Sequence, residues 1–364
     1  MLSGHIQEIN IKKYRGIQKL QLKNLNDINI LVGDNNSGKT SVLEVISSLD
    51  NPHNIGTWAR LIRENFNGLK RKLFFDGFFN MFPVDEDEKY ISYQYIDKNG
   101  KATDVMLTAT LEETQIPERE MFRINGLMET EHKKEEDAMI DTRCMHLGIS
   151  VNGKEVGRYE LYDFQNRISM FVENKKSFVR TVYVSPNDHA LGNLHLNNVL
   201  ADSELYEEML AILKKFDKDI IHINAVQVNN SAVPEYMVLT QNHKRALPLK
   251  VYGDGMKKAI LLLSAVVEAK DGILLLDEFE TAIHTSAMDS IFSWILESAK
   301  KLNVQVFLTS HSKEAIDKVL RCNKSLQSAI NVYTLYKKDN QNLVRTMDCF
   351  EAIRTQENLG LELR

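Results

Sequence analysis

The stretch Gly33-Asp34-Asn35-Asn36-Ser37-Gly38-Lys39-Thr40 matches the phosphate-loop pattern G-x-x-x-x-G-K-[ST] at every required position. An apolar segment over residues 28–32 precedes it, and a helix-like run over residues 41–49 follows it. Glycines allow backbone N–H groups to close around phosphate oxygens, and the helix N-terminus attracts the same anion. Because both flanks are correct, we interpret the stretch as a nucleotide-binding loop rather than as a turn that only caps a helix.

Two side chains of this loop carry most of its expected chemistry. Lys39 is predicted to reach the β- and γ-phosphates of ATP or GTP, and Thr40 to offer its hydroxyl to the Mg²⁺ ion that bridges these phosphates. The fold class that follows is α/β, with a phosphate loop between a buried strand and a helix.

The composition is that of an ordinary soluble globular protein, with 26% charged and 43% hydrophobic residues in 364. This length suits two domains, or one domain with a large insertion. The N-terminus has no apolar signal segment, and the longest apolar run, residues 260–267, is too short to span a membrane. We therefore expect a cytoplasmic protein without a membrane partner.

Charge and cysteine content bear on two further classes of protein. A net charge of −5 argues against a protein that coats nucleic acid by bulk charge, although a local basic groove keeps DNA open as a partner. The basic segment over residues 60–72 is most simply a solvated helix face. Cys144, Cys322 and Cys349 form no C-x-x-C pair, so we expect ordinary thiols rather than a disulfide framework or a zinc site.

The region after the phosphate loop is predicted to be a β-rich insertion. Asn99-Gly100 and Asn152-Gly153 each lie between strand-like segments and are typical of two-residue hairpin turns. The charged run over residues 129–137 is predicted to be an exposed loop. The predicted division of the chain is an ATPase-type domain at 1–65 and 178–364, with a helical lobe at about 188–270, and an insertion at 66–177.

Two carboxylates follow a run of four apolar residues at 273–276. This is the pattern of a buried parallel strand whose C-terminal end meets a ligand. Asp277 is expected to hold the Mg²⁺ shell, directly or through water, and Glu278 to orient or deprotonate the attacking water. An edge strand with an acidic turn would have the same letters, but the phosphate loop favours the catalytic interpretation.

A histidine follows the next predicted strand, over residues 304–310. The neutral imidazole of His311 could hydrogen-bond the γ-phosphate and report its presence, which requires no change of protonation. A lone histidine at a strand end is usually structural. The place of His311, one helix and one strand after Asp277-Glu278, favours the sensor role.

Gly253-Asp254-Gly255 begins the helix that leads to the Asp277 strand. A glycine-rich helix start again offers backbone N–H groups to an anion. Because the chain already has one phosphate loop, we interpret this second place as facing a nucleotide held by another subunit. A simple capped helix is the alternative.

Taken in this order, the motifs resemble the ATP-binding-cassette superfamily in its chromosome-maintenance and RecF branch. They resemble still more the OLD (overcoming lysogenisation defect) family and its relatives among stand-alone bacterial AAA-type ATPases. The resemblance covers residues 1–50 and 178–320 well and the insertion loosely. The matching segments are Tyr14-Arg15-Gly16-Ile17, residues 33–41, residues 253–256, Leu276-Asp277-Glu278 with Glu280 and Ile283-His284, and residues 309–312.

The resemblance implies an ABC ATPase head fold that uses ATP and Mg²⁺ in a homodimer or higher homo-oligomer. In it, the glycine signature of one subunit covers the ATP of the other, with residues 280–284 as a dimer-facing loop. Gly253-Asp254-Gly255 departs from the usual Ser-Gly-Gly, and the Q-loop has no glutamine, Asp76 being the nearest placement. The residues expected to bind nucleotide are Asn35, Asn36, Ser37, Gly38, Lys39, Thr40, Ser41, Gly253, Asp254 and Gly255; those for Mg²⁺ are Thr40 and Asp277; the catalytic ones are Glu278 and His311.

Full-length OLD proteins add a TOPRIM nuclease domain, whose acidic metal-site pattern is absent from the about fifty residues after His311. We expect a hairpin there, over residues 330–336 and 343–347, and a short tail. The predicted function is a dimerising ATPase of an OLD-like, anti-phage system that controls a separate effector protein, a nuclease or toxin. A RecF-like DNA repair ATPase and an ATP-bound scaffold that barely hydrolyses are the alternatives.

Overall fold

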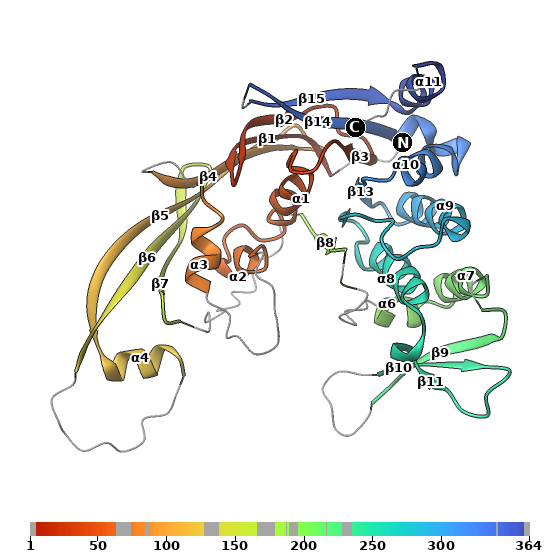
Figure 1. Cartoon of the computed structure of the whole chain (residues 1–364), viewed down its shortest axis with the longest axis horizontal. Helices are drawn as coiled ribbons and strands as arrows, with labels where there is room; N and C mark the ends of the chain where they lie inside the picture. The colour runs from red at the N-terminus through yellow and green to blue at the C-terminus, as the bar shows by residue number, and fades with distance from the viewer. Residues whose placement is uncertain are drawn as a thin grey trace.

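The computed structural model describes residues 5–62, 74–83, 88–126, 138–165, 179–186, 188, 196–215, 217–227, 235–339 and 341–359, which form three sheets and the helices around them (Figure 1). The strands are β1 Ile6–Tyr14, β2 Ile17–Leu22, β3 Ile28–Val32, β4 Lys89–Asp97, β5 Ala102–Pro117, β6 Met139–Val151, β7 Lys154–Tyr162, β8 Thr181–Val184, β9 Ile220–Val226, β10 Glu235–Thr240, β11 Leu247–Pro248, β12 Ile273–Leu276, β13 Gln305–Thr309, β14 Ile330–Lys338 and β15 Gln341–Asp348. The helices are α1 Lys39–Ser47, α2 Ile55–Ala59, α3 Phe74–Phe79, α4 Glu118–Ile124, α6 Leu196–Leu200, α7 Ser203–Leu213, α8 Asp254–Glu268, α9 Thr285–Lys301, α10 Lys313–Arg321 and α11 Cys349–Leu359, with 3-10 turns η1 Leu249–Val251 and η2 Lys324–Ala329.

The sheet that positions the phosphate loop has the strand order β15-β14-β3-β13-β12-β8. Its strands β14, β3, β13, β12 and β8 run parallel, and β15 returns antiparallel beside β14. Every residue of β3, β12 and β13 is buried, as expected for parallel strands that are covered on both faces. The C-terminal ends of these strands share one edge, so the loops that follow β3, β12 and β13 meet there.

A second sheet, antiparallel, has the order β2-β1-β4-β5-β6-β7. β1 pairs with β2 on one side and with β4 on the other. The residues predicted as a β-rich insertion therefore form strands that continue the sheet begun at Ile6. This pairing joins segments that are far apart in sequence, and no local pattern indicates it.

The two predicted hairpins form, with different turns. Asn152-Gly153 closes β6 and β7 as the expected two-residue turn, with φ of 52° and 75°. Asn99-Gly100 lies in a longer connection over residues 98–101, so the prediction of a two-residue turn was wrong there. The Asp97 carboxylate accepts hydrogen bonds from the N–H groups of Asn99 and Lys101, which stabilises the wider loop.

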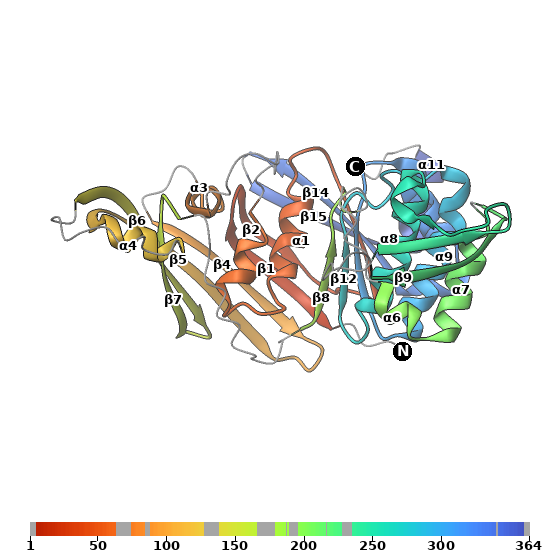
Figure 2. The ribbon, with the colours of Figure 1, turned by 90° about the horizontal axis from the view of Figure 1, so that it is seen from below.

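Two apolar cores lie on opposite faces of the parallel sheet, because successive strand residues point to opposite faces. Leu31, Leu275 and Phe307 belong to the core shared with α1 and the antiparallel sheet. The alternate residues of the same strands join the core shared with α8, α9 and α10. Figure 2 shows α1 and the antiparallel sheet on one side of the parallel strands, and α7, α8 and α9 on the other. The phosphate loop thus lies between two packed layers.

Tyr14-Arg15, at the turn between β1 and β2, ties α1 to neighbouring segments. Arg15 Nε lies 3.1 Å from Glu44 Oε2 of α1, in an ion pair with side chains only 13% and 5% exposed. The other guanidinium nitrogens donate to the carbonyl oxygens of Leu61 at 2.8 Å and Asn80 at 3.2 Å. The arginine therefore connects the antiparallel sheet with α1 and with the segments next to α2 and α3.

The C-terminal hairpin is confirmed as β14 and β15, but the tail after it was predicted without a helix, and it forms α11. The buried positions of α11 are Cys349, Ala352 and Thr355, whose small side chains give only a weak helical pattern. The charged run at 129–137 and residues 63–73 of the basic segment lie outside the described residues. Among the residues described, no helix combines the length and apolar character needed to cross a membrane.

Candidate active site

The phosphate loop connects β3 to α1 in a conformation that requires its glycines. Gly33 has a φ of 140° and Gly38 a φ of 102°, values that residues with a Cβ rarely adopt. A Cβ on Gly33 would also lie 2.1 Å from the backbone oxygen of Leu335. Ser37 Oγ is buried and has no hydrogen-bond partner among the described residues. An anion with several acceptor oxygens would fit this loop of open donors.

Lys39 occupies the centre of the loop. Its Nζ donates to the carbonyl oxygens of Gly33 at 2.7 Å and Asp34 at 2.9 Å, and the residue is 5% exposed. Burial lowers the pKa of Lys39, and the nearby carboxylates of Asp277, Asp34 and Glu278 offset part of that effect. A buried ammonium that has only neutral acceptors would bind a phosphate oxygen more strongly than these carbonyls.

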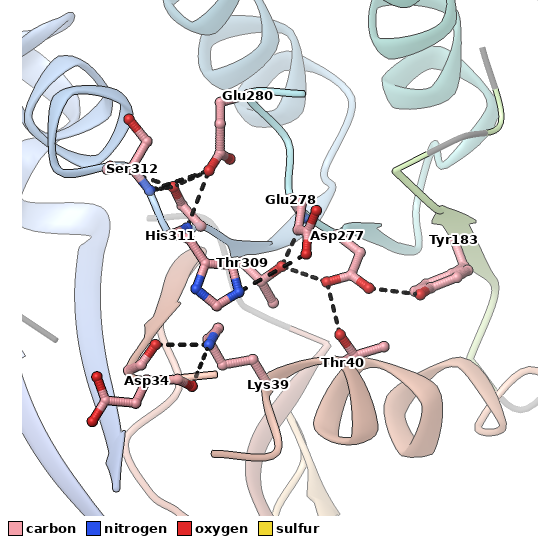
Figure 3. Close-up of polar contacts among 12 residues, drawn as sticks. Asp34, Lys39, Thr40, Tyr183, Asp277, Glu278, Glu280, Thr309, His311 and Ser312 are labelled. Carbon is pink, nitrogen blue, oxygen red and sulfur yellow. Dashed lines mark hydrogen bonds and ion pairs between the residues drawn. The ribbon is translucent and has the colours of Figure 1, made fainter. Parts of the chain in front are cut away.

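Asp277, directly after β12, accepts hydrogen bonds from hydroxyl groups on three different elements (Figure 3). Its Oδ1 accepts hydrogen bonds from Thr40 Oγ1 at 3.2 Å and Thr309 Oγ1 at 2.5 Å, and its Oδ2 accepts one from Tyr183 OH at 3.0 Å. The carboxylate is therefore fixed against the first turn of α1. It is only 4% exposed, and its orientation toward the end of the phosphate loop suits a ligand for a hard cation.

Glu278 turns away from the strand at a φ of 43°, a strained value for a residue with a side chain. Its backbone N–H donates to Thr309 Oγ1 at 2.8 Å, so the same hydroxyl orients both acidic residues. Glu278 Oε1 lies 3.9 Å from His311 Nε2, with the two side chains 44% and 35% exposed. An acceptor carboxylate and an imidazole thus face solvent side by side, next to Asp277.

The loop between β13 and α10 carries His311 and is held by a third carboxylate. Glu280 Oε1 accepts hydrogen bonds from Ser310 Oγ at 2.8 Å, His311 N–H at 3.1 Å and Ser312 N–H at 3.2 Å. Figure 3 shows Glu280 and His311 on either side of this loop.

Comparison with known proteins agrees with this geometry. A family model described as "AAA domain, putative AbiEii toxin, Type IV TA system" matches residues 174–317, and one described as "Protein of unknown function (DUF2813)" matches residues 4–55. An ATP/GTP phosphatase of Helicobacter pylori is 24% identical over 368 residues, which cover 94% of this chain and 95% of that protein. These matches support an ATPase of the ABC type.

Two further matches concern a repair protein and a solved ATPase head. The DNA replication and repair protein RecF of Bacillus thuringiensis is 36% identical over 72 residues, 19% of this chain and 19% of RecF. The crystal structure of an Smc head bound to the C-winged helix domain of ScpA superposes with a TM-score of 0.52 at 13% identity, covering 96% of this chain and 99% of that one. The fold is that of an SMC-type ATPase head, which confirms the α/β fold class predicted from the sequence.

The fold brings most of the predicted site residues together, from segments far apart in the sequence. Lys39, Thr40, Asp277, Glu278 and His311 lie around one loop cluster (Figure 3). Gly253 and Gly255, at the start of α8, have no hydrogen bond to this cluster among the described residues. A Cβ on Gly255 would lie 3.3 Å from the Ala282 carbonyl oxygen, whereas a Cβ on Gly253 would have no neighbour within 4 Å.

Three contributors to this site were missed or misplaced by sequence reasoning. Asp76, placed nearest the Q-loop, lies in α3, which packs on α2 and β7; the side chain that reaches Asp277 from the neighbouring strand is Tyr183. The hydrogen bonds of the Thr309 hydroxyl with Asp277 and Glu278, and the contact of Glu280 with the His311 loop, were not predicted either. Polar residues at the ends of otherwise apolar strands were the available signal, and Thr309 and Tyr183 both fit it.

Proposed function

We propose that this ABC-type ATPase binds ATP with Mg²⁺ and hydrolyses it at the cluster of Lys39, Thr40, Asp277 and Glu278. The observation that carries the proposal is the Asp277 carboxylate, fixed by three hydroxyls beside the phosphate loop and followed by a partly exposed Glu278. A loop that only bound an anion would not need this second, acidic half.

The chain's own groups have separable tasks in this reaction. Lys39 and the loop N–H groups hold the β- and γ-phosphates, while Thr40 and Asp277 would hold Mg²⁺, which supplies charge neutralisation there. Glu278 orients a water molecule and accepts its proton as the water oxygen attacks the γ-phosphorus. The bond to the β,γ-bridging oxygen breaks, and ADP and phosphate result. His311 is placed to hydrogen-bond the γ-phosphate.

We further propose that two copies of the chain close over ATP, with Gly253-Asp254-Gly255 of one covering the nucleotide of the other. Gly253 has a φ of −62°, which any residue adopts, and open space where a Cβ would lie, so none of the described residues requires a glycine there. Close approach of a ligand from outside would require one. Val251, two residues earlier, is 62% exposed although apolar, which also suits a surface that another copy covers.

The wider role that we propose is control of a separate effector, a nuclease or toxin, in an OLD-like defence system. Two observations support it: the motif order, and a family match whose description names a toxin–antitoxin system. The local likeness to RecF favours DNA repair as a second candidate. Titration with gapped and intact DNA over a range of salt concentrations separates the two, because a repair ATPase binds gapped DNA preferentially.

The direct test of the catalytic proposal is steady-state phosphate release, together with binding of a fluorescent ATP analogue. Lys39→Ala should lose nucleotide binding. Glu278→Gln should keep binding and lose about 10²- to 10⁴-fold in turnover, the usual effect of removing a general base. Turnover by Glu278→Gln at the wild-type rate would contradict the proposal. Tight binding with negligible wild-type turnover would instead indicate an ATP-bound scaffold.

A further inference from the structure

The loop that carries His311 is organised by one oxygen atom. Glu280 Oε1 accepts a hydrogen bond from the Ser310 hydroxyl and from the N–H groups of two successive residues, His311 and Ser312. Hydrogen bonds that fix two successive N–H groups also fix the direction in which the side chain between them leaves the backbone. The His311 imidazole leaves this backbone toward Glu278, on the other side of the loop (Figure 3).

These hydrogen bonds are not needed to begin the helix that follows. The N-cap of α10 is Ser312, whose own hydroxyl accepts the hydrogen bond of the Ala315 N–H at 3.2 Å. Ser310 Oγ also accepts from the Ser312 N–H at 2.9 Å. Glu280 therefore adds a constraint to His311 that the helix start does not require.

Glu280 also acts electrostatically on a buried lysine of α8. Glu280 Oε2 is buried and has no hydrogen-bond partner among the described residues. Lys258, in α8, is fully buried, and its Nζ lies 3.4 Å from the Pro186 carbonyl oxygen. Burial lowers the pKa of Lys258, and the carboxylates of Asp188 and then Glu280 offset part of this shift. The acid is thus placed between the His311 loop and the helix that begins at Gly253.

We propose that Glu280 is a positioning residue for hydrolysis, which holds the backbone of residues 310–312 so that His311 stays beside Glu278. The inference rests on the proposed function, because a held imidazole affects turnover only if ATP is hydrolysed here. Glu280 acts through His311 and does not itself touch the reacting atoms. It should therefore affect the rate of the chemical step and leave nucleotide binding by the phosphate loop intact.

The test combines kinetics with amide hydrogen exchange on the full chain, for Glu280→Ala and Glu280→Gln. In Glu280→Ala, the amide of residue 311 should lose protection, whereas that of residue 312 keeps the Ser310 hydroxyl as an acceptor. The kcat should fall about 10- to 100-fold with KM within about twofold. Glutamine keeps an acceptor oxygen, so Glu280→Gln should retain protection and lose less than tenfold in kcat. Glu297→Ala is the matched control, because Glu297 also accepts side-chain hydrogen bonds, from Ser293 and Asn323, on α9.

The outcomes separate the two proposals. Lost protection in Glu280→Ala with unchanged kcat would overturn the positioning role while the proposed hydrolysis stands. Unchanged protection would overturn the holding of the loop itself. If Glu280→Ala does not fold, Glu280→Gln decides: a kcat loss as large as that of Glu278→Gln would contradict a role that depends on hydrogen-bond acceptance. Absence of turnover in the wild-type chain would contradict the proposed hydrolysis. It would also contradict the positioning role, even if the exchange data show that Glu280 holds the loop.

Discussion

At the scale of single residues, the acidic half of the site depends on one buried hydroxyl. Thr309 Oγ1 donates to Asp277 and accepts from the Glu278 N–H, and the residue is 1% exposed. Without this hydroxyl, the Asp277 oxygen and the Glu278 N–H would need water in its place, and burial of the site excludes water. The position of Asp277 and the strained turn at Glu278 are therefore held by a residue on the neighbouring strand.

Replacing this hydroxyl should weaken both stability and turnover. Thr309→Val keeps the shape of the side chain but removes one of the three hydrogen bonds to the Asp277 carboxylate and leaves the Glu278 N–H without its acceptor, which costs about 1–3 kcal/mol in the free energy of unfolding. Turnover should fall about 10- to 100-fold, as for other groups that orient a metal ligand. Thr309→Ser retains the hydroxyl and should stay near wild type in both urea denaturation and phosphate release. Equal effects of valine and serine would contradict this role.

The charge of Lys39 predicts a pH dependence of nucleotide binding. Burial lowers the pKa of Lys39 below the usual 10.5, so the free chain loses this positive charge at a lower pH than an exposed lysine does. Nucleotide affinity should therefore be constant at neutral pH and weaken as the pH rises through the lowered pKa. Fluorescence titrations over an alkaline pH series check this. Affinity that is unchanged up to pH 10.5 would show that the charge of Lys39 does not contribute.

The residues of this site differ in whether the neighbouring sequence alone indicates their role. Lys39, Asp277 and Glu278 could be predicted because each follows an apolar strand in a short contiguous pattern. Tyr183 and Thr309 could not, since each is an ordinary residue until β8 and β13 are placed on either side of β12. The charged groups could therefore be predicted from sequence patterns, whereas the roles of the Tyr183 and Thr309 hydroxyls, which orient Asp277, are seen only from the order of the strands.

At the scale of elements, the connection from β3 to α1 depends on Gly33. The residue combines a φ of 140° with a site where a Cβ would lie 2.1 Å from the Leu335 oxygen. Because β14 runs beside β3 there, the crowding comes from a strand about 300 residues later in the chain. The loop can relieve it only by moving away from its phosphate-binding shape.

Gly33→Ala should therefore destabilise the fold by more than about 2 kcal/mol and abolish binding of an ATP analogue. Gly153→Ala is the control. Gly153 also has a positive φ, 75°, but a Cβ there would have no neighbour within 4 Å, so the cost should be about 1 kcal/mol with binding unchanged. Chemical denaturation and nucleotide titration measure both. Similar losses in the two variants would indicate that backbone strain alone, without the contact to β14, explains Gly33.

The elements differ in how far the sequence predicts them. The buried strands β3, β12 and β13 and the helix α8 have strong patterns, and all were predicted. The helix α11 was missed because its buried face is made of small and polar side chains. The hairpin at Asn99-Gly100 was predicted with the wrong turn, because the Asp97 side chain, not the dipeptide, sets the length of that loop.

At the scale of the whole molecule, the antiparallel sheet is attached to the nucleotide-binding sheet through α1. The largely buried Arg15–Glu44 pair joins the β1–β2 turn to this helix, and Gly38, at the start of α1, would crowd the Ile17 side chain if it carried a Cβ. The end of the phosphate loop is therefore in direct contact with the antiparallel sheet. The pairing of β1 with β4, which unites that sheet, has no local signal and could not be predicted.

The start of α8 lies beside the loop that follows Glu278, where a Cβ on Gly255 would lie 3.3 Å from the Ala282 carbonyl oxygen. Gly253 has open space around it and follows the exposed Val251. In the proposed closed dimer these residues would lie against the nucleotide of the other copy. Each γ-phosphate would then add charge-assisted hydrogen bonds across the interface, so that ATP stabilises the closed state and hydrolysis reopens it.

The mass of Glu278→Gln in solution, measured by light scattering with and without ATP and Mg²⁺, tests this account most directly. ATP should convert the variant from the 41.8 kDa chain to a species of twice that mass, and Gly253→Glu in the same background should prevent the conversion without unfolding the chain. A Glu278→Gln variant that binds ATP yet keeps the same mass with and without it would contradict the closing of two copies over a shared nucleotide.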